Sequence, residues 1–205
     1  MRKIQGLIVL VGVAVGGAEE GFVPLFNGKS LDGWEVDTPR VWAVRDGMIV
    51  GKHQGQKWND FLRTKKNYEN FILKAEFRLV GGVGNSGIQF RSKPVPNSHE
   101  VSGYQADVGE KYWGCLYDES RRNKVLVEPP AAALDGVKKD GWNEYVIRAE
   151  GWRIKLELNG VQTVDFLETD TKIERTGFIA LQVHSGPGIE VQFRNLRIRE
   201  LPRGD

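Results

Sequence analysis

Apolar and polar residues alternate with a period of two over much of this chain, and this pattern restricts the fold more than any other feature. Between Phe71 and Leu79 every second residue is apolar, and Lys74, Glu76 and Arg78 lie between them. Successive side chains of a β-strand point to opposite faces, so the pattern is that of a strand with one buried face. No stretch shows a convincing amphipathic-helix period. The sequence therefore predicts an all-β domain.

Turn-forming dipeptides separate the predicted strands. Asp46-Gly47 and Asn159-Gly160 are typical of two-residue hairpin turns. The predicted strands cover residues 42–44, 48–50, 71–79, 87–91, 103–108, 142–149, 152–158, 161–166, 177–184 and 191–193. This many strands in one domain predict a two-sheet antiparallel sandwich of jelly-roll or lectin type, because one open sheet would leave its apolar face in water.

The N-terminus has the composition of a secretory signal peptide. Arg2 and Lys3 precede an apolar run over residues 4–15, and small residues follow at 16–18. A membrane helix needs about 20 apolar residues, so the run is short for a span, and an N-terminal anchor is the alternative interpretation. We expect a signal peptide over 1–18, one β-sandwich domain over 19–205, and a periplasmic or secreted mature protein without a membrane span.

Charge and cysteine content exclude further classes. Without Arg2 and Lys3 the 29 basic residues become 27, which equals the 27 acidic ones. A nucleic-acid-binding domain would show a basic surplus, so we expect no nucleic-acid partner. Cys115 is the only cysteine, so no internal disulfide can form and the fold must rest on its core.

Several predicted strands carry a distinctive set of polar residues at positions that alternation places off the core. Two interpretations are open: a sheet surface that faces water, or a concave binding site. Amides combined with carboxylates, arginines and a histidine favour a site for an oligosaccharide or glycoside. These residues are Glu76, Gln89, Arg91, Gln105, Asp107, Gln182, His184 and Arg194.

A long segment from about residue 110 to 141 shows no strand pattern but is rich in aromatic residues. Loops of this length inside a compact domain are usually functional. We interpret it as a wall over one sheet face, with Trp113 and Tyr117 as candidates for stacking on sugar rings, together with Tyr112 and Trp58. The alternative for each is ordinary packing.

No residue spacing identifies a cofactor. A divalent metal ion could bind to His184 and Asp107 together with Glu76, but no close pair such as His-x-x-x-His supports this. A Gly-x-Ser-x-Gly elbow is also absent from the sequence, which argues against a serine-type hydrolase.

Several short motifs occur in an order that resembles the 3-keto-disaccharide hydrolase domain family. They include residues 25–34 (LFNGKSLDGW), 75–78 (AEFR), 85–88 (NSGI), 141–143 (GWN), 158–160 (LNG), 181–186 (LQVHSG) and 193–196 (FRNL). The resemblance extends over nearly the whole mature chain. It implies a concanavalin A-like sandwich and cleavage of the glycosidic bond of a 3-keto-glycoside.

The implied chemistry assigns roles to the polar residues. A carbonyl at carbon 3 acidifies the proton on carbon 2, so a base, an enolate stabiliser and an acid suffice for elimination, which hydration follows. Glu76 or His184 could be the base, Arg91 the stabiliser, and Asp107 an acid or metal ligand. Gln89, Gln105, Gln182 and Arg194 are predicted to bind substrate.

Other mechanisms and functions remain open at this stage. Direct hydrolysis by two carboxylates, Glu76 and Asp107, is the rival mechanism. A non-catalytic carbohydrate-binding module and a structural domain of the cell envelope are the rival functions. The catalytic interpretation requires Glu76, Arg91, Gln105, Asp107 and His184 to share one cleft, with residues 112–130 along its rim.

Overall fold

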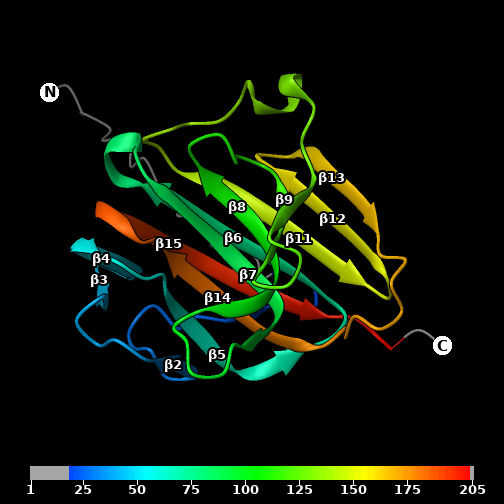
Figure 1. Cartoon of the computed structure of the whole chain (residues 1–205), viewed down its shortest axis with the longest axis horizontal. Helices are drawn as coiled ribbons and strands as arrows, with labels where there is room; N and C mark the ends of the chain where they lie inside the picture. Colours follow the sequence, from blue (N-terminus) through cyan, green and yellow to red (C-terminus); the bar gives the residue numbers. More distant parts are fainter. Residues whose placement is uncertain (1–18, 204–205) are drawn as a thin grey trace, which may run out of the picture.

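The computed structural model describes residues 19–203, and these form two antiparallel β-sheets packed face to face (Figure 1). The predicted signal peptide lies outside the described residues. Within the described part, no helix is long and apolar enough to cross a membrane. The prediction of an all-β sandwich is confirmed.

The first sheet, sheet A, contains eight of the strands formed within residues 19–203. Its order is β13-β12-β11-β6-β15-β4-β3, and β1 adds to β15. The bounds are β1 Val23–Pro24, β3 Trp42–Arg45, β4 Met48–Gln56, β6 Phe71–Leu79, β11 Asn143–Glu150, β12 Arg153–Leu158, β13 Val161–Leu167 and β15 Gly186–Glu200.

The second sheet, sheet B, contains seven strands in the same part of the chain, in the order β10-β9-β8-β7-β14-β5-β2. The bounds are β2 Trp34–Val36, β5 Asp60–Tyr68, β7 Asn85–Pro94, β8 Val101–Gly109, β9 Leu116–Glu119, β10 Lys124–Val127 and β14 Gly177–Val183. Two short 3-10 turns, Val80–Gly82 and Ala131–Leu134, complete the described structure.

Two hairpin turns form where the sequence predicted them. Asp46 and Gly47 have φ angles of 49° and 74°, and Asn159 and Gly160 have 52° and 80°. Positive φ at both central residues defines the type I′ turn, whose twist matches that of the flanking strands. These turns fix the registers of β3 with β4 and of β12 with β13.

The core lies between the sheets and is built from the inward positions of both. Phe77 of β6 is fully buried, and its ring stacks on Tyr145 of β11 at 5.1 Å between centroids. Trp113, which precedes β9, packs on Phe77 from the other sheet at 6.2 Å. Trp113 is therefore a core residue, and its predicted role as a sugar-stacking side chain is wrong.

The segment over 110–141 is more regular than the sequence predicted. It contains β9 and β10, which extend sheet B beyond β8. The sequence pattern does not reveal β9, because its inward positions are occupied by Leu116 and by the charged Asp118, which is fully buried. An inward charge breaks the apolar alternation by which strands are recognised.

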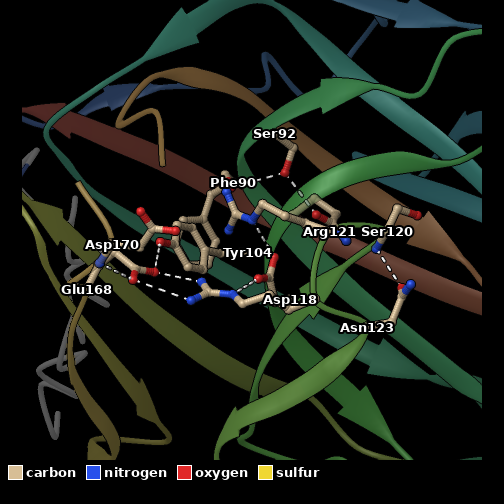
Figure 2. A network of polar contacts seen from close by, with 11 residues as sticks. Phe90, Ser92, Tyr104, Asp118, Ser120, Arg121, Asn123, Glu168 and Asp170 are labelled. Carbon is tan, nitrogen blue, oxygen red and sulfur yellow. Dashed lines mark hydrogen bonds and ion pairs between the residues drawn. The ribbon is translucent and has the colours of Figure 1, made fainter. Parts of the chain in front are cut away.

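An ion-pair network at one end of the sandwich explains how Asp118 is tolerated inside (Figure 2). Asp118 accepts hydrogen bonds from Arg121 at 2.8 Å and from Arg122. Arg122 also pairs with Glu168, which follows β13, at 2.6 Å, and the Tyr104 hydroxyl of β8 donates to the same carboxylate at 2.6 Å. A buried charge needs such partners. The network therefore joins the two sheets.

Candidate functional site

The candidate site lies on the face of sheet B that points away from the core. Within the described residues, a cleft of about 240 Å³ is lined by Asn59, Asn85, Gln105, Asp107, Glu110, Tyr112, Tyr117, Glu119 and His184. The strands β7, β8, β9 and β14 present their non-core positions there, while Ile88, Ala106 and Leu181 face inward. Strand alternation in the sequence predicts that Gln105, Asp107 and His184 share one cleft, and the structure brings them together there.

A chain of side-chain hydrogen bonds crosses the floor of the cleft. The Gln89 amide donates to Gln105 Oε1 at 2.9 Å, and Gln105 Nε2 donates to Asp107 Oδ2 at 3.2 Å. The Asn85 amide donates to Asp107 Oδ1 at 3.1 Å. Gly87 makes this possible, because a Cβ there would lie 2.4 Å from the Gln105 side chain. These contacts fix the carboxylate of Asp107.

Asp107 is a deeply buried carboxyl group with an altered acidity. Its side chain is 3 % exposed, and burial raises its pKa to about 7, although the hydrogen bonds from Gln105 and Asn85 act in the opposite direction. Its backbone is anchored from the core side, where the Tyr145 hydroxyl donates to the Asp107 carbonyl at 2.5 Å. Asp107 is therefore rigid and can exchange a proton near neutral pH.

Glu119 is a second carboxyl group with a raised pKa, although it is only partly buried, and the sequence analysis missed it. Burial, together with the negative charge of Glu100, raises its pKa to about 7. The register pairs it with Gly103 of β8, so it projects over a position without a side chain. Two acidic groups that titrate near neutral pH in one cleft are typical of a functional site.

His184 lies at the end of β14 and offers a free ring nitrogen. Its Nδ1 lies 2.8 Å from the Ser185 carbonyl oxygen. A carbonyl can only accept, so Nδ1 carries the proton of the neutral ring and Nε2 holds a lone pair. Nε2 makes no hydrogen bond to a described residue, which leaves it available as a proton acceptor.

Gln182 lies on the same face as the cleft, between Gly87 of β7 and Phe61 of β5. Its side chain is fully buried, and neither amide atom finds a hydrogen-bond partner among the described residues. Buried amide groups are usually paired, and an unpaired one lowers stability. The unpaired amide of Gln182 should therefore lower the stability of this part of sheet B.

Aromatic residues form part of the rim, as predicted. Tyr112 and Tyr117 line the cleft, and their rings meet edge to face at 6.2 Å. Trp58 stacks on His99 at 5.0 Å, and the adjacent Asn59 donates to Glu100. The rim therefore includes the segment before β9, and the β7–β8 loop supports Asn59 from behind.

Glu76 and Arg194 do not belong to this cleft. Both lie on the outer face of sheet A, where they pair with each other at 2.7 Å, and Asn195 also donates to Glu76. Alternation shows that a residue is off the core but not on which sheet it lies. The prediction that Glu76 shares a cleft with His184 is wrong, and Arg194 is equally remote from the proposed substrate site.

Arg91 has a structural environment. Its guanidinium donates to the backbone carbonyls of Glu69 and Gly151, each at 2.8 Å, and to the Asn70 side chain at 3.2 Å. Arg91 has a φ of 48° in a register shift of β7, which turns it away from the cleft. The prediction that it stabilises an enolate is therefore wrong.

A metal site at the predicted residues does not form, because Glu76 lies on the other sheet. Across residues 19–203, no group of three or more His, Cys, Asp and Glu side chains is arranged to hold a metal ion.

Comparisons with solved structures agree with the observed fold. A proposed glycosyl hydrolase from Parabacteroides distasonis ATCC 8503 superimposes with a TM-score of 0.68 at 23% identity, over 89% of this chain and 95% of that one. A carbohydrate-binding module from Bacillus subtilis gives a TM-score of 0.65 at 19% identity, over 82% and 96%. A Bacillus subtilis protein of unknown function with a galectin-like fold gives 0.66 at 10% identity, over 89% and 96%. These identities show the shared fold.

Sequence comparison is more specific. Among curated proteins no sequence is significantly similar to this chain. The model of the family described as the 3-keto-alpha-glucoside-1,2-lyase-like domain, however, matches residues 21–199, which is nearly the whole sandwich. The chain therefore belongs to the 3-keto-alpha-glucoside-1,2-lyase-like domain family.

Proposed function

We propose that this protein cleaves the glycosidic bond of a 3-keto-glycoside by elimination followed by hydration, in the cleft on sheet B. The observation that carries the proposal is the presence in one cleft of a histidine with a free ring nitrogen and two carboxyl groups with pKa values of about 7. Family membership supports the same activity. We further propose that the protein is exported and acts in the periplasm or outside the cell.

In the proposed reaction, Nε2 of His184 removes the proton from carbon 2, and the electron pair moves onto the oxygen at carbon 3. The bond from carbon 1 to the leaving oxygen then breaks, and Glu119 in its protonated form donates the proton that this oxygen requires. Addition of water across the resulting double bond returns a proton to carbon 2 and places a hydroxyl on carbon 1. The net reaction is hydrolysis.

Other residues of the cleft supply binding and charge stabilisation. The hydroxyl groups of Tyr112 and Tyr117 are neutral donors that can reach the enolate oxygen and so take the role that the sequence predicts for Arg91. Asp107, held by Gln105 and Asn85, fixes the orientation of these amides for the sugar hydroxyls. The rival mechanism with Glu76 and Asp107 is not supported, since these carboxyl groups lie on different sheets.

The test uses 4-nitrophenyl 3-keto-glucoside, whose cleavage releases nitrophenolate, with unoxidised 4-nitrophenyl glucoside as the control substrate. Cleavage in D₂O should place deuterium at carbon 2 of the product, which direct hydrolysis would not do. His184→Gln should lower kcat on this substrate by about 100- to 10,000-fold. Glu119→Gln should lower kcat to a similar degree only on a 3-keto-disaccharide, because a sugar leaving group needs the donated proton whereas nitrophenolate leaves without it. Glu76→Gln is the matched control and should keep its activity, because it lies on sheet A. Equal cleavage of both substrates, or loss of activity in the Glu76 variant, would overturn the proposal.

One observation favours a second function, the non-catalytic binding of carbohydrate. The cleft volume of about 240 Å³ is small beside the roughly 300–1,000 Å³ of typical ligand pockets. A cleft of this size suits one terminal sugar unit. Calorimetric binding of the 3-keto-glycoside without turnover would support this function over the enzymatic one.

A further inference from the structure

A second groove, larger than the candidate cleft, lies on the outer face of sheet A at its β3–β4 edge. Its volume is about 590 Å³. Ala43 of β3 and Val50 of β4 form an apolar floor, because their neighbours Trp42 and Ile49 point into the core. Nothing in the proposed reaction uses this groove.

The groove carries a concentrated positive charge. Arg40, Arg45, Lys52 and Lys57 all line it, and no carboxylate is among its lining residues. Of these four side chains, only Lys52 forms an ion pair within residues 19–203, with Glu190 at 2.8 Å. The chain after residue 18 has equal numbers of basic and acidic residues, so this excess is local. Such a local surplus attracts an anionic ligand.

The groove is connected with the candidate cleft through two residues. Trp58 lines the groove, while the next residue, Asn59, lines the cleft. His53 also lines the groove, and its Nδ1 accepts a hydrogen bond from the Gly55 amide. The proton of the neutral ring is therefore on Nε2, which donates to the His184 carbonyl at 2.8 Å. The two cavities open on different sheets but approach each other at residues 58–59.

We propose that this groove binds an acidic oligosaccharide of the uronate type. Carboxylates of the sugar would pair with Arg40, Arg45 and Lys57, and its hydroxyls with the neighbouring glutamines Gln54 and Gln56. The apolar floor and the Trp58 ring suit the apolar faces of sugar rings. The choice of a sugar over another anion rests on the function proposed for the adjoining cleft, while the preference for an anion rests on the groove alone.

Isothermal titration calorimetry with trigalacturonate tests the proposal, with maltotriose as the uncharged control. Trigalacturonate should bind, and its affinity should fall as salt is added. The combined variant Arg40→Gln, Arg45→Gln, Lys57→Gln should weaken binding by about ten- to a hundredfold, because three exposed charge contacts are lost. The matched control, Lys65→Gln, Lys138→Gln, Lys139→Gln, removes the same charge from exposed positions outside the groove and should change affinity less than about twofold.

Three outcomes would overturn the inference. They are equal losses in both triple variants, equal binding of maltotriose, and tighter binding of a single-stranded oligonucleotide than of trigalacturonate in the same groove. Because binding is measured without turnover, the result does not depend on the reaction in the cleft. Absence of activity on the 3-keto-glycoside, with intact trigalacturonate binding, would refute the proposed function and leave the groove assignment in place.

Discussion

Replacement of Glu119 by glutamine should make the protein more stable at neutral pH but not at acidic pH. The pKa of this carboxyl is about 7 in the fold, against an ordinary value of 4.5. Between these values the unfolded chain has released the proton while the folded protein keeps it, so the free energy of unfolding falls as pH rises. A difference of this size corresponds to about 3 kcal/mol.

The free energy of unfolding of the wild-type protein should therefore fall by about 3 kcal/mol relative to that of Glu119→Gln between about pH 4.5 and about pH 7. Above that range the difference should stay constant. Urea unfolding of both proteins across this pH range measures the difference directly. Asp107 titrates in the same direction but is present in both proteins, so its contribution cancels. Glu20→Gln, at an exposed position, controls for the loss of one negative charge. A stability difference that stays constant across the range would refute the assignment of Glu119 as an acid whose pKa is raised in the fold.

Three further substitutions test the structural assignments. Arg91→Leu should lower stability by about 2–4 kcal/mol, because one buried and two part-buried acceptors lose the Arg91 donor, while kcat of the folded protein stays near normal. Melting curves and activity are measured side by side, and a large fall in kcat would return Arg91 to the mechanism. Arg122→Met should destabilise the fold by about 3–5 kcal/mol, since the carboxylates of Asp118 and Glu168 lose their shared cation. A double-mutant cycle with Glu168→Gln that shows no coupling energy would contradict this. Gln182→Leu should stabilise the fold by about 1–3 kcal/mol, because it removes two unpaired buried polar atoms. A lowered Tm would show that the Gln182 amide has hydrogen-bond partners.

The class of fold could be predicted from the sequence because alternation and turn chemistry are local. Strand 71–79 and the Asn159-Gly160 turn depend on residues that are adjacent in the chain, and both predictions are confirmed. Sheet membership is not local. Strands β6 and β8 show the same parity, yet Glu76 and Asp107 lie on opposite faces of the sandwich, since pairing with distant strands decides which sheet each one joins.

The remaining errors have equally specific causes. Arg91 has a positive φ and lies within a register shift of β7, and a single shift of this kind reverses the face on which the next residues lie. Glu119 was missed because the preceding inward residue is a charged one, stabilised by arginines that the strand pattern cannot foresee. Strand parity found the polar residues of the cleft floor but could not find its second acid.

The placement of the two C-terminal strands determines when the protein can fold. Strand β14 enters between β5 and β7, and β15 enters between β4 and β6, so the segment 177–200 forms the middle of both sheets. A chain synthesised only as far as residue 176 therefore has two divided sheets, each with unpaired strand edges at the gap. The cleft residues from Asn59 to His184 can meet only after that gap closes. Folding of the sandwich is thus delayed until the segment 177–200 has been made, and loop closure over about a hundred residues makes it slow.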